Sequence, residues 1–210
     1  MATPALELRD LGCVRSGRAL FSHLNLSVPA GRLLRVTGAN GAGKTSLLRM
    51  VCGLLSPACG EVLWRGGRIA TLREEFHRQL VYLGHAAALK DDLSATENLL
   101  TAARLAGGSP SEQEAAAALN AAGLRGHERS PVRTLSQGQR RRVALARLVL
   151  GSAVPLWVLD EPFNALDATA AAWLVGLVSA HVASGGVVLL TSHQADLALQ
   201  PTTPQQELVL

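Results

Sequence analysis

Short aliphatic runs alternate with amphipathic stretches at both ends of the chain. Runs of this kind between turn residues are typical of buried strands, and they occur at 6–11, 24–28, 33–37, 61–64, 80–84, 156–159 and 187–191. Apolar residues at helical spacing predict helices over 44–54, 73–79 and 168–184. Strands that alternate with helices in this way predict an α/β core.

The middle of the chain has a different pattern and is rich in alanine and leucine. Residues 94–97 and 111–114 both have the form Ser-x-x-Glu, the capping box that opens a helix. A third helix is expected from Gly138 to about Leu150. These signals together predict an all-helical insertion between the strands at the two ends.

Composition indicates a folded domain and leaves its partner open. The 210 residues are 48% hydrophobic and 17% charged, which argues against disorder. A net charge of +4 suits nucleic acid, phosphate ligands or an anionic membrane surface. Arg140–Arg142 is a tight basic run, and we interpret it as a solvated helix face.

Cysteines and apolar stretches bear on the compartment. Cys13, Cys52 and Cys59 show no CxxC spacing, so we interpret them as reduced, buried thiols of a cytosolic protein. Residues 168–195 lack Asp, Glu, Lys and Arg, but Gly185-Gly186 divides them into pieces shorter than the roughly 20 residues of a membrane span. We therefore expect no transmembrane helix. We also expect no signal peptide, because the charged residues Arg9 and Asp10 interrupt the start of the chain before an apolar segment forms.

A glycine-rich loop between a predicted strand and a predicted helix fits the phosphate-binding pattern G-x-x-x-x-G-K-T. Its glycines allow backbone N–H groups to turn toward phosphates, and the helix N-terminus adds its dipole. Lys44 is expected to hold the β- and γ-phosphates and Thr45 to ligate Mg²⁺. The candidate ATP-binding residues here are Gly38, Ala39, Asn40, Gly41, Ala42, Gly43, Lys44, Thr45 and Ser46.

Two acids follow the predicted strand 156–159. Alone, such a pair could be a helix cap or a solvated edge. Downstream of a phosphate loop, Asp160 is instead expected to hold Mg²⁺, and Glu161 to orient and polarise the attacking water.

Three further motifs complete a recognisable set. The sequence Leu135-Ser-Gln-Gly-Gln139 by itself is compatible with a simple N-capping turn. It lies, however, between the phosphate loop and the strand that precedes the two acidic residues. Asn164-Ala-Leu-Asp167 and Thr191-Ser-His193 follow in order. In this arrangement the chain resembles the ATP-binding-cassette (ABC) superfamily over nearly its whole length.

That resemblance implies a fold and a division of the chain. The fold is α/β, a P-loop NTPase (RecA-like) core with an antiparallel β lobe and an inserted α-helical subdomain. Residues 1–210 would form one ATPase domain, with the core at about 1–89 and 152–210 and the helical subdomain at about 90–151.

The resemblance also implies a mechanism that uses ATP and Mg²⁺. Two copies would face each other head to tail, each ATP lying between the phosphate loop of one copy and the signature of the other. The signature residues Ser136, Gln137 and Gly138 would contact ATP across that interface. His193 would hold the γ-phosphate in line with Glu161, and hydrolysis would release the two halves.

Coupling residues and departures from the family pattern are also visible. Asp167 would link the two sites of the pair, and Gln137 replaces a usual glycine. Residues 14–17 lack the aromatic that normally stacks on adenine, so Phe21 could serve instead or the base could be held more loosely. His85 occupies the hinge position where a glutamine is usual, and it is either a substitute for that glutamine or a surface histidine.

Finer details resemble the ATP-binding subunits of the haem exporters of bacterial cytochrome c maturation. These details include residues 83–85, 138–147 and 156–163. The resemblance implies a peripheral subunit on the cytoplasmic face of the inner membrane, with a multi-span permease and other haem-handling membrane proteins as partners. His85, His127 and His181 are scattered and indicate no haem site.

Two alternatives stay open. The chain could serve a transporter for another substrate. It could also be a soluble cassette acting on DNA or ribosomes, although such relatives usually carry a coiled-coil insertion or a second cassette. We expect no nucleic-acid partner.

Overall fold

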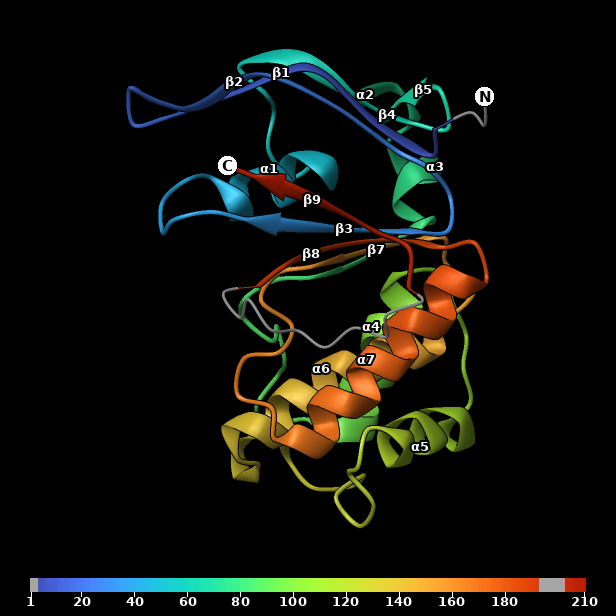
Figure 1. The fold of residues 1–210 in the computed structure, drawn as a ribbon. Coiled ribbons are helices and arrows are strands. Elements are labelled where there is room, and N and C mark those ends of the chain that lie inside the picture. Colours follow the sequence, from blue (N-terminus) through green and yellow to red (C-terminus); the bar gives the residue numbers. More distant parts are fainter. Residues whose placement is uncertain (1–3, 193–202) are drawn as a thin grey trace.

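Two β-sheets and a layer of helices make up the fold, which we describe from a computed structural model. The structure describes residues 4–192 and 203–210. An antiparallel sheet lies above a parallel sheet with helix α1 between them, and helices α4 to α7 lie on the other side of the parallel sheet (Figure 1).

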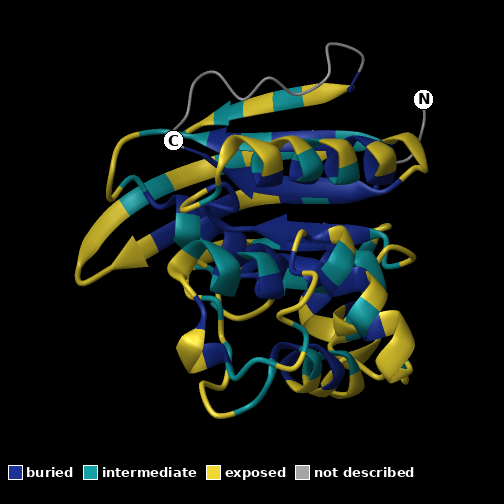
Figure 2. Ribbon diagram, turned by 90° about the horizontal axis from the view of Figure 1, so that it is seen from below, coloured by how far each residue is buried: buried dark blue, intermediate teal, exposed yellow. Residues whose placement is uncertain are grey.

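The antiparallel sheet is built around the first two strands. Its order is β2 (Arg18–Val28), β1 (Leu6–Arg15), β4 (Cys59–Trp64) and β5 (Gly67–Arg68). The strand expected at 24–28 is therefore longer than predicted, because residues 18–23 pair with β1 in a hairpin although they lack an apolar alternation. The tip of this hairpin is exposed (Figure 2).

The parallel sheet supplies the predicted α/β core. Its order is β6 (Leu80–Leu83), β7 (Leu156–Leu159), β8 (Val187–Thr191), β3 (Arg32–Thr37) and β9 (Gln205–Val209), with every neighbouring pair parallel. Four of these strands were predicted. The fifth, β9, was not, because its Gln-Gln-Glu start is polar and its partner β3 lies far away in the sequence.

Most of the predicted helices form. The helices are α1 (Lys44–Val51), α2 (Ile69–Leu72), α3 (Glu74–His77), α4 (Ala95–Leu105), α5 (Glu112–Ala121), α6 (Gln137–Leu150) and α7 (Ala168–Ala183), with a 3-10 turn at Val132–Thr134. Capping boxes at Ser94 and Ser111 open α4 and α5 as predicted. The helix expected over 73–79 forms as the shorter α3, and α2 before it was not predicted; Arg73, with a φ of 40°, separates the two. In the part of the chain that is described, no helix has the length and apolarity needed to span a membrane.

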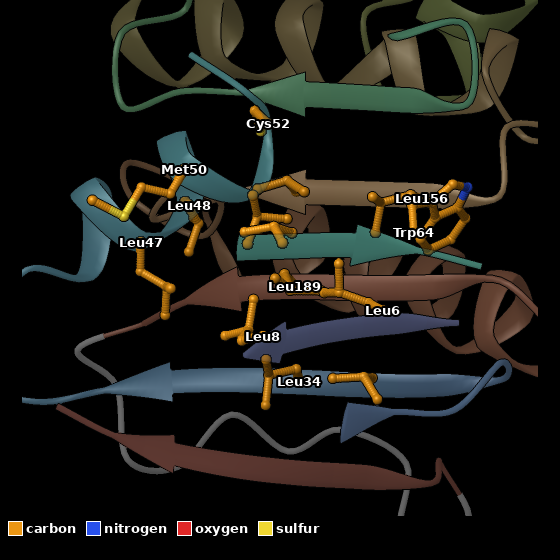
Figure 3. Packing of buried hydrophobic residues seen from close by; sticks show 14 of the residues in the cluster. Leu6, Leu8, Leu34, Leu47, Leu48, Met50, Cys52, Trp64, Leu156 and Leu189 are labelled. Atoms are coloured by element: carbon orange, nitrogen blue, oxygen red, sulfur yellow. The ribbon is translucent and has the colours of Figure 1, made fainter. Parts of the chain in front are cut away.

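The parallel sheet is buried on both faces. Leu34 and Leu189 belong to a cluster shared with the antiparallel sheet and α1 (Figure 3), whereas their neighbours Leu33 and Val188 pack with α6 and α7. Burial on both faces explains why these strands are continuously aliphatic. Each fully buried leucine contributes about 1.5–3 kcal/mol.

Helix α6 joins two apolar clusters. Its Leu145 and Leu148 pack beneath the parallel sheet, while its Val143 and Ala146 pack with α4 and α5. The helix is therefore anchored both to the core and to the other helices between residues 90 and 151.

The expectation of three buried thiols was wrong for one of them. Cys13 and Cys52 are buried, and burial raises the pKa of the Cys52 thiol. Cys59 is exposed, because it begins β4 at the rim of the antiparallel sheet.

Candidate active site

The glycine-rich loop connects β3 to α1, as the sequence predicted. Gly38 and Gly43 have φ values of +140° and +110°, which other residues rarely adopt. Space restricts them as well: a Cβ on Gly38 would lie 2.5 Å from the carbonyl oxygen of Leu210, and one on Gly43 would lie 3.0 Å from the ring of Phe21. The loop is thus packed between β9 and the first hairpin.

Lys44 opens α1 and folds back onto this loop. Its Nζ donates hydrogen bonds to the carbonyl oxygens of Gly38 at 2.8 Å and Ala39 at 3.1 Å. The side chain is buried without a carboxylate partner among the described residues. A buried ammonium held only by neutral carbonyls is suited to receive a phosphate.

Asp160 lies at the end of β7, beside hydroxyls from α1 and β8. Its Oδ1 accepts hydrogen bonds from Thr191 Oγ1 at 2.8 Å and Thr45 Oγ1 at 3.3 Å. Its Oδ2 is buried without a hydrogen-bond partner in the described structure. A buried, unsatisfied carboxylate oxygen next to a threonine hydroxyl fits the oxygen ligands that Mg²⁺ prefers.

Glu161 follows directly in an unusual backbone conformation. Its φ is 49°, and its backbone N–H donates a 2.8 Å hydrogen bond to Thr191 Oγ1. A non-glycine residue in this region is strained and is held there by its surroundings. Thr191 therefore orients both acidic residues. This role was not predicted from the sequence. The one signal for it is that the carboxyl ends of parallel strands β7 and β8 lie at the same edge of the sheet.

Lys44, Thr45 and Glu161 line one cavity of about 530 Å³, within the range of ligand sites. Asp160 does not line it and reaches it only through its hydrogen bond with Thr45. The cavity is lined by Arg15, Leu20, Asn40, Gly41, Gly43, Lys44, Thr45, Ser46, His85, Glu161 and Asn164. The structure thus brings most of the predicted phosphate-loop residues together with the catalytic candidate Glu161 and the hinge residue His85.

The position expected to hold adenine is occupied by an arginine. Arg15, at the end of β1, lines the cavity together with Leu20. It has no carboxylate partner within residues 4–192 and 203–210. Phe21 instead packs against Gly43 and joins the apolar cluster beneath the loop. Arg15 was not predicted as a site residue, because the family pattern places an aromatic residue at this position.

The signature residues are placed differently. Ser136 is the N-cap of α6 in a capping box with Gln139, and both Ser136 and Gln137 are exposed. A Cβ on Gly138 would lie 2.8 Å from the carbonyl oxygen of Ala165, so glycine is required by this close approach. None of Ser136, Gln137 and Gly138 lines the cavity around Lys44.

The remaining two candidates stand apart. Asp167 is the N-cap of α7, and its Oδ1 accepts a 2.8 Å hydrogen bond from the N–H of Ala170. His193 lies outside the described residues.

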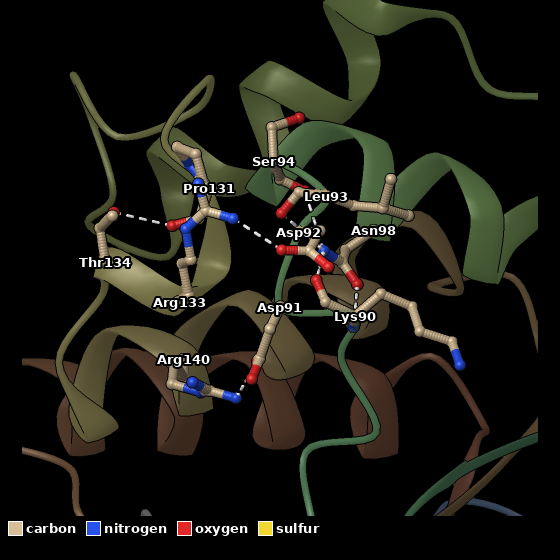
Figure 4. Close-up of polar contacts among 10 residues, drawn as sticks. All are labelled: Lys90, Asp91, Asp92, Leu93, Ser94, Asn98, Pro131, Arg133, Thr134 and Arg140. Carbon is tan, nitrogen blue, oxygen red and sulfur yellow. Dashed lines mark hydrogen bonds and ion pairs between the residues drawn. The ribbon is translucent and has the colours of Figure 1, made fainter.

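The basic run at 140–142 is a solvated face only in part, and the prediction was wrong for Arg141. Arg140 pairs with Asp91 beside the Arg133–Asp92 ion pair (Figure 4). Arg142 donates to the carbonyl oxygen of Gly123, and Arg141 is buried with 6% of its surface exposed. The reason is that the Arg141 side chain is directed into the core, where it donates to backbone carbonyl oxygens, whereas Arg140 keeps 33% of its side-chain surface exposed.

Comparison with known proteins agrees with this geometry. The family model described as ABC transporter matches residues 21–164. The cytochrome c biogenesis ATP-binding export protein CcmA of Aromatoleum aromaticum is 54% identical over 96% of this chain and 94% of its own length. The CcmA protein of Dechloromonas aromatica is 51% identical over 90% of this chain and 92% of its own length.

A solved structure gives the same answer for the fold. The structure of an ATP binding subunit of an ABC transporter superposes with a TM-score of 0.85 and 27% identity, covering 98% of this chain and 85% of that one. The expected ABC nucleotide-binding fold is confirmed. The chain belongs to the ABC transporter family, as an ATP-hydrolysing subunit of the CcmA group.

Proposed function

We propose that this chain is the ATPase subunit of the complex that exports or releases haem for cytochrome c biogenesis. The observation that carries this proposal is the 54% identity to a CcmA protein, which extends over 96% of the chain. Identity of this extent includes both the nucleotide cavity and the helices between residues 90 and 151.

The phosphates of ATP would lie along the glycine-rich loop, with Lys44 on the β- and γ-phosphates. Thr45 and Asp160 would hold Mg²⁺, for which the unpartnered Oδ2 of Asp160 is available. When bound, Mg²⁺ neutralises negative charge on the phosphates. Glu161 would orient the attacking water and accept its proton, with His193 holding the γ-phosphate in line.

Arg15 would take the base. A guanidinium plane can stack on a nucleobase through cation–π and π-stacking contacts. Support comes from its place in the lining of the same cavity as Lys44 and Thr45 and from its lack of an acidic partner among the described residues.

A second copy of the chain would complete each site. Ser136 and Gln137 are exposed and lie outside the cavity that holds Lys44. In a head-to-tail pair, the signature of one copy would cover ATP bound to the other, and Asp167 would link the two sites. Neither copy would then have a complete site alone.

The membrane partner would dock beside His85. This residue borders the nucleotide cavity and also a cleft of about 510 Å³ between the parallel sheet and α6. The cleft is lined by residues 82–88, by Arg49 and Leu54, and by Arg141, Ala144 and Arg147 of α6. A multi-span permease seated there would sense nucleotide through His85 while the helical subdomain at about 90–151 moves. The chain would then be peripheral, on the cytoplasmic face of the inner membrane.

The test is a mild-detergent pull-down of tagged Glu161→Gln protein from its native host with ATP present, followed by mass spectrometry. The Glu161→Gln variant should retain bound ATP without hydrolysing it and so trap the head-to-tail dimer. A multi-span permease and haem-handling membrane proteins are therefore expected in the eluate. Lys44→Ala is the matched control, because this variant should bind ATP weakly and should therefore not form the nucleotide-dependent dimer.

Each other outcome has a meaning. A membrane partner without haem-handling companions would keep the transporter function and reject haem. Only soluble or nucleic-acid-associated partners would reject both.

A further inference from the structure

Arg141 forms an unusual set of contacts in the interior. It lies in the second turn of α6, and among the described residues its guanidinium donates only to backbone carbonyl oxygens. The acceptors are Glu161 at 2.7 Å, Asp160 at 3.0 Å, Gly84 at 3.1 Å, Pro162 at 3.3 Å and His85 at 3.4 Å.

Each donor of the planar fork has a defined target. Nη2 donates to the backbone carbonyl oxygens of the two acidic residues that follow β7. Nη1 donates to the backbone carbonyl oxygens of the hinge residues after β6, and Nε to that of Pro162. Burial lowers the pKa of Arg141, while the carboxylates of Asp160 and Glu161 oppose that shift. A lysine in its place would present one compact charge and could not span all these carbonyls.

The acceptors belong to the two segments that matter most for catalysis. One is the strained turn at Glu161, with its φ of 49°. The other is the hinge at residues 84–85, where His85 faces both the nucleotide cavity and the cleft beside α6.

Arg141 itself is carried by the signature helix. Ser136 caps α6 five positions before Arg141, so the signature and the guanidinium are rigidly connected through the first turns. Downstream, the same helix is held by apolar residues in two clusters. A displacement of α6 therefore displaces Arg141 and, through its hydrogen bonds, the backbone that carries Glu161 and His85.

We propose that Arg141 is a positioning residue that sets the Glu161 turn and the His85 hinge according to the position of the signature helix. When the signature engages nucleotide, α6 and Arg141 place the Glu161 carboxylate for the reaction. When α6 moves away, the same bonds draw the turn out of line. This inference rests on the proposed ATPase function, since it assigns a residue to that reaction.

The experiment compares Arg141→Lys and Arg141→Gln with Arg142→Lys, in membranes that contain the full complex. Arg142 is the matched control because it lies on the same helix and, in the part of the chain that is described, its side chain donates only to the Gly123 carbonyl oxygen. For both Arg141 variants, kcat should fall about 10²-fold, the loss expected when a catalytic group is displaced by about 1 Å. The Kd for ATP should stay within about threefold, because no atom of Arg141 lines the cavity.

A double variant separates positioning from general support. If Arg141 acts through Glu161, adding Arg141→Lys to Glu161→Gln should lower the residual turnover no further, because groups acting as a unit are not additive. Full additivity would overturn the proposal. Wild-type turnover in either Arg141 variant, or failure of both to fold and bind ATP, would overturn it as well. Absence of ATP hydrolysis in the wild-type complex itself would instead contradict the proposed function.

Discussion

The two halves of the nucleotide site are built in opposite ways. Around the phosphate loop, side chains from three elements already meet: Thr45, Asp160 and Thr191 are joined by hydrogen bonds of 2.8 to 3.3 Å. At the signature, Ser136 is exposed, and its hydrogen bonds to described residues all lie within its own helix turn. One half is preorganised by the core, whereas the other is displayed on the surface.

This difference indicates which property of the enzyme each half governs. Contacts in the core half are buried and intrachain, so they should govern nucleotide affinity in a single copy. In the proposed head-to-tail pair, the signature half would contribute to a site only when a second copy supplies it. Perturbations of the two halves should therefore separate affinity from turnover.

Lys44→Ala should have the largest effect. Removing the ammonium should lower turnover by at least about 10²–10³-fold, the cost of losing one strong donor to a developing charge, and should weaken ATP binding in a single copy. Within the described structure the side chain donates only to two loop carbonyl oxygens, so the melting temperature should change little. Calorimetric titration with ATP checks this, and undiminished affinity would contradict the assignment.

Gly138→Ala should separate the halves most clearly. The added Cβ would lie 2.8 Å from the Ala165 carbonyl, so the signature must shift. A shift near 1 Å should cost about 10²-fold in turnover, while ATP affinity of the single copy should be unchanged. ATP-dependent dimerisation, measured by light scattering in a Glu161→Gln background, should be lost. An equal loss of single-copy affinity would show that the two halves are not separate.

Thr191→Val tests how far the core half is preorganised. The variant keeps the shape but leaves Asp160 Oδ1 and the Glu161 N–H without their 2.8 Å partner. We expect turnover to fall about tenfold and stability by about 1–3 kcal/mol, the penalty for unpaired buried polar groups. Denaturant unfolding and steady-state kinetics measure the two effects. Turnover equal to that of the wild type would show that other contacts hold the acids.

Arg15→Ala should have the smallest effect, limited to the base. Stacking of an exposed guanidinium contributes about 0.5–1 kcal/mol, so ATP affinity should fall about two- to fivefold. The affinity for inorganic triphosphate should not change. Arg18→Ala is the control, since Arg18 is also exposed on the hairpin but does not line the cavity. An equal loss for triphosphate would place Arg15 on the phosphates instead.

Local patterns in the sequence determined most of the fold. Aliphatic runs identified the buried strands of the parallel sheet, because a strand covered on both faces must be continuously apolar. Ser-x-x-Glu identified the starts of α4 and α5, because the capping box is made within four residues. The glycine-rich loop likewise identified the phosphate site, since its chemistry requires a contiguous segment.

Tertiary structure alone decided where distant groups meet. Arg141 bonds the carbonyl of Gly84, 57 positions away, and Thr191 bonds Asp160, 31 positions away. Strand β9 joins β3 by backbone hydrogen bonds that leave little trace in residue type. Backbone acceptors are the same at every position, so a sequence cannot show which carbonyl a buried guanidinium will find. Only the packing of α6 against the sheet determines that choice.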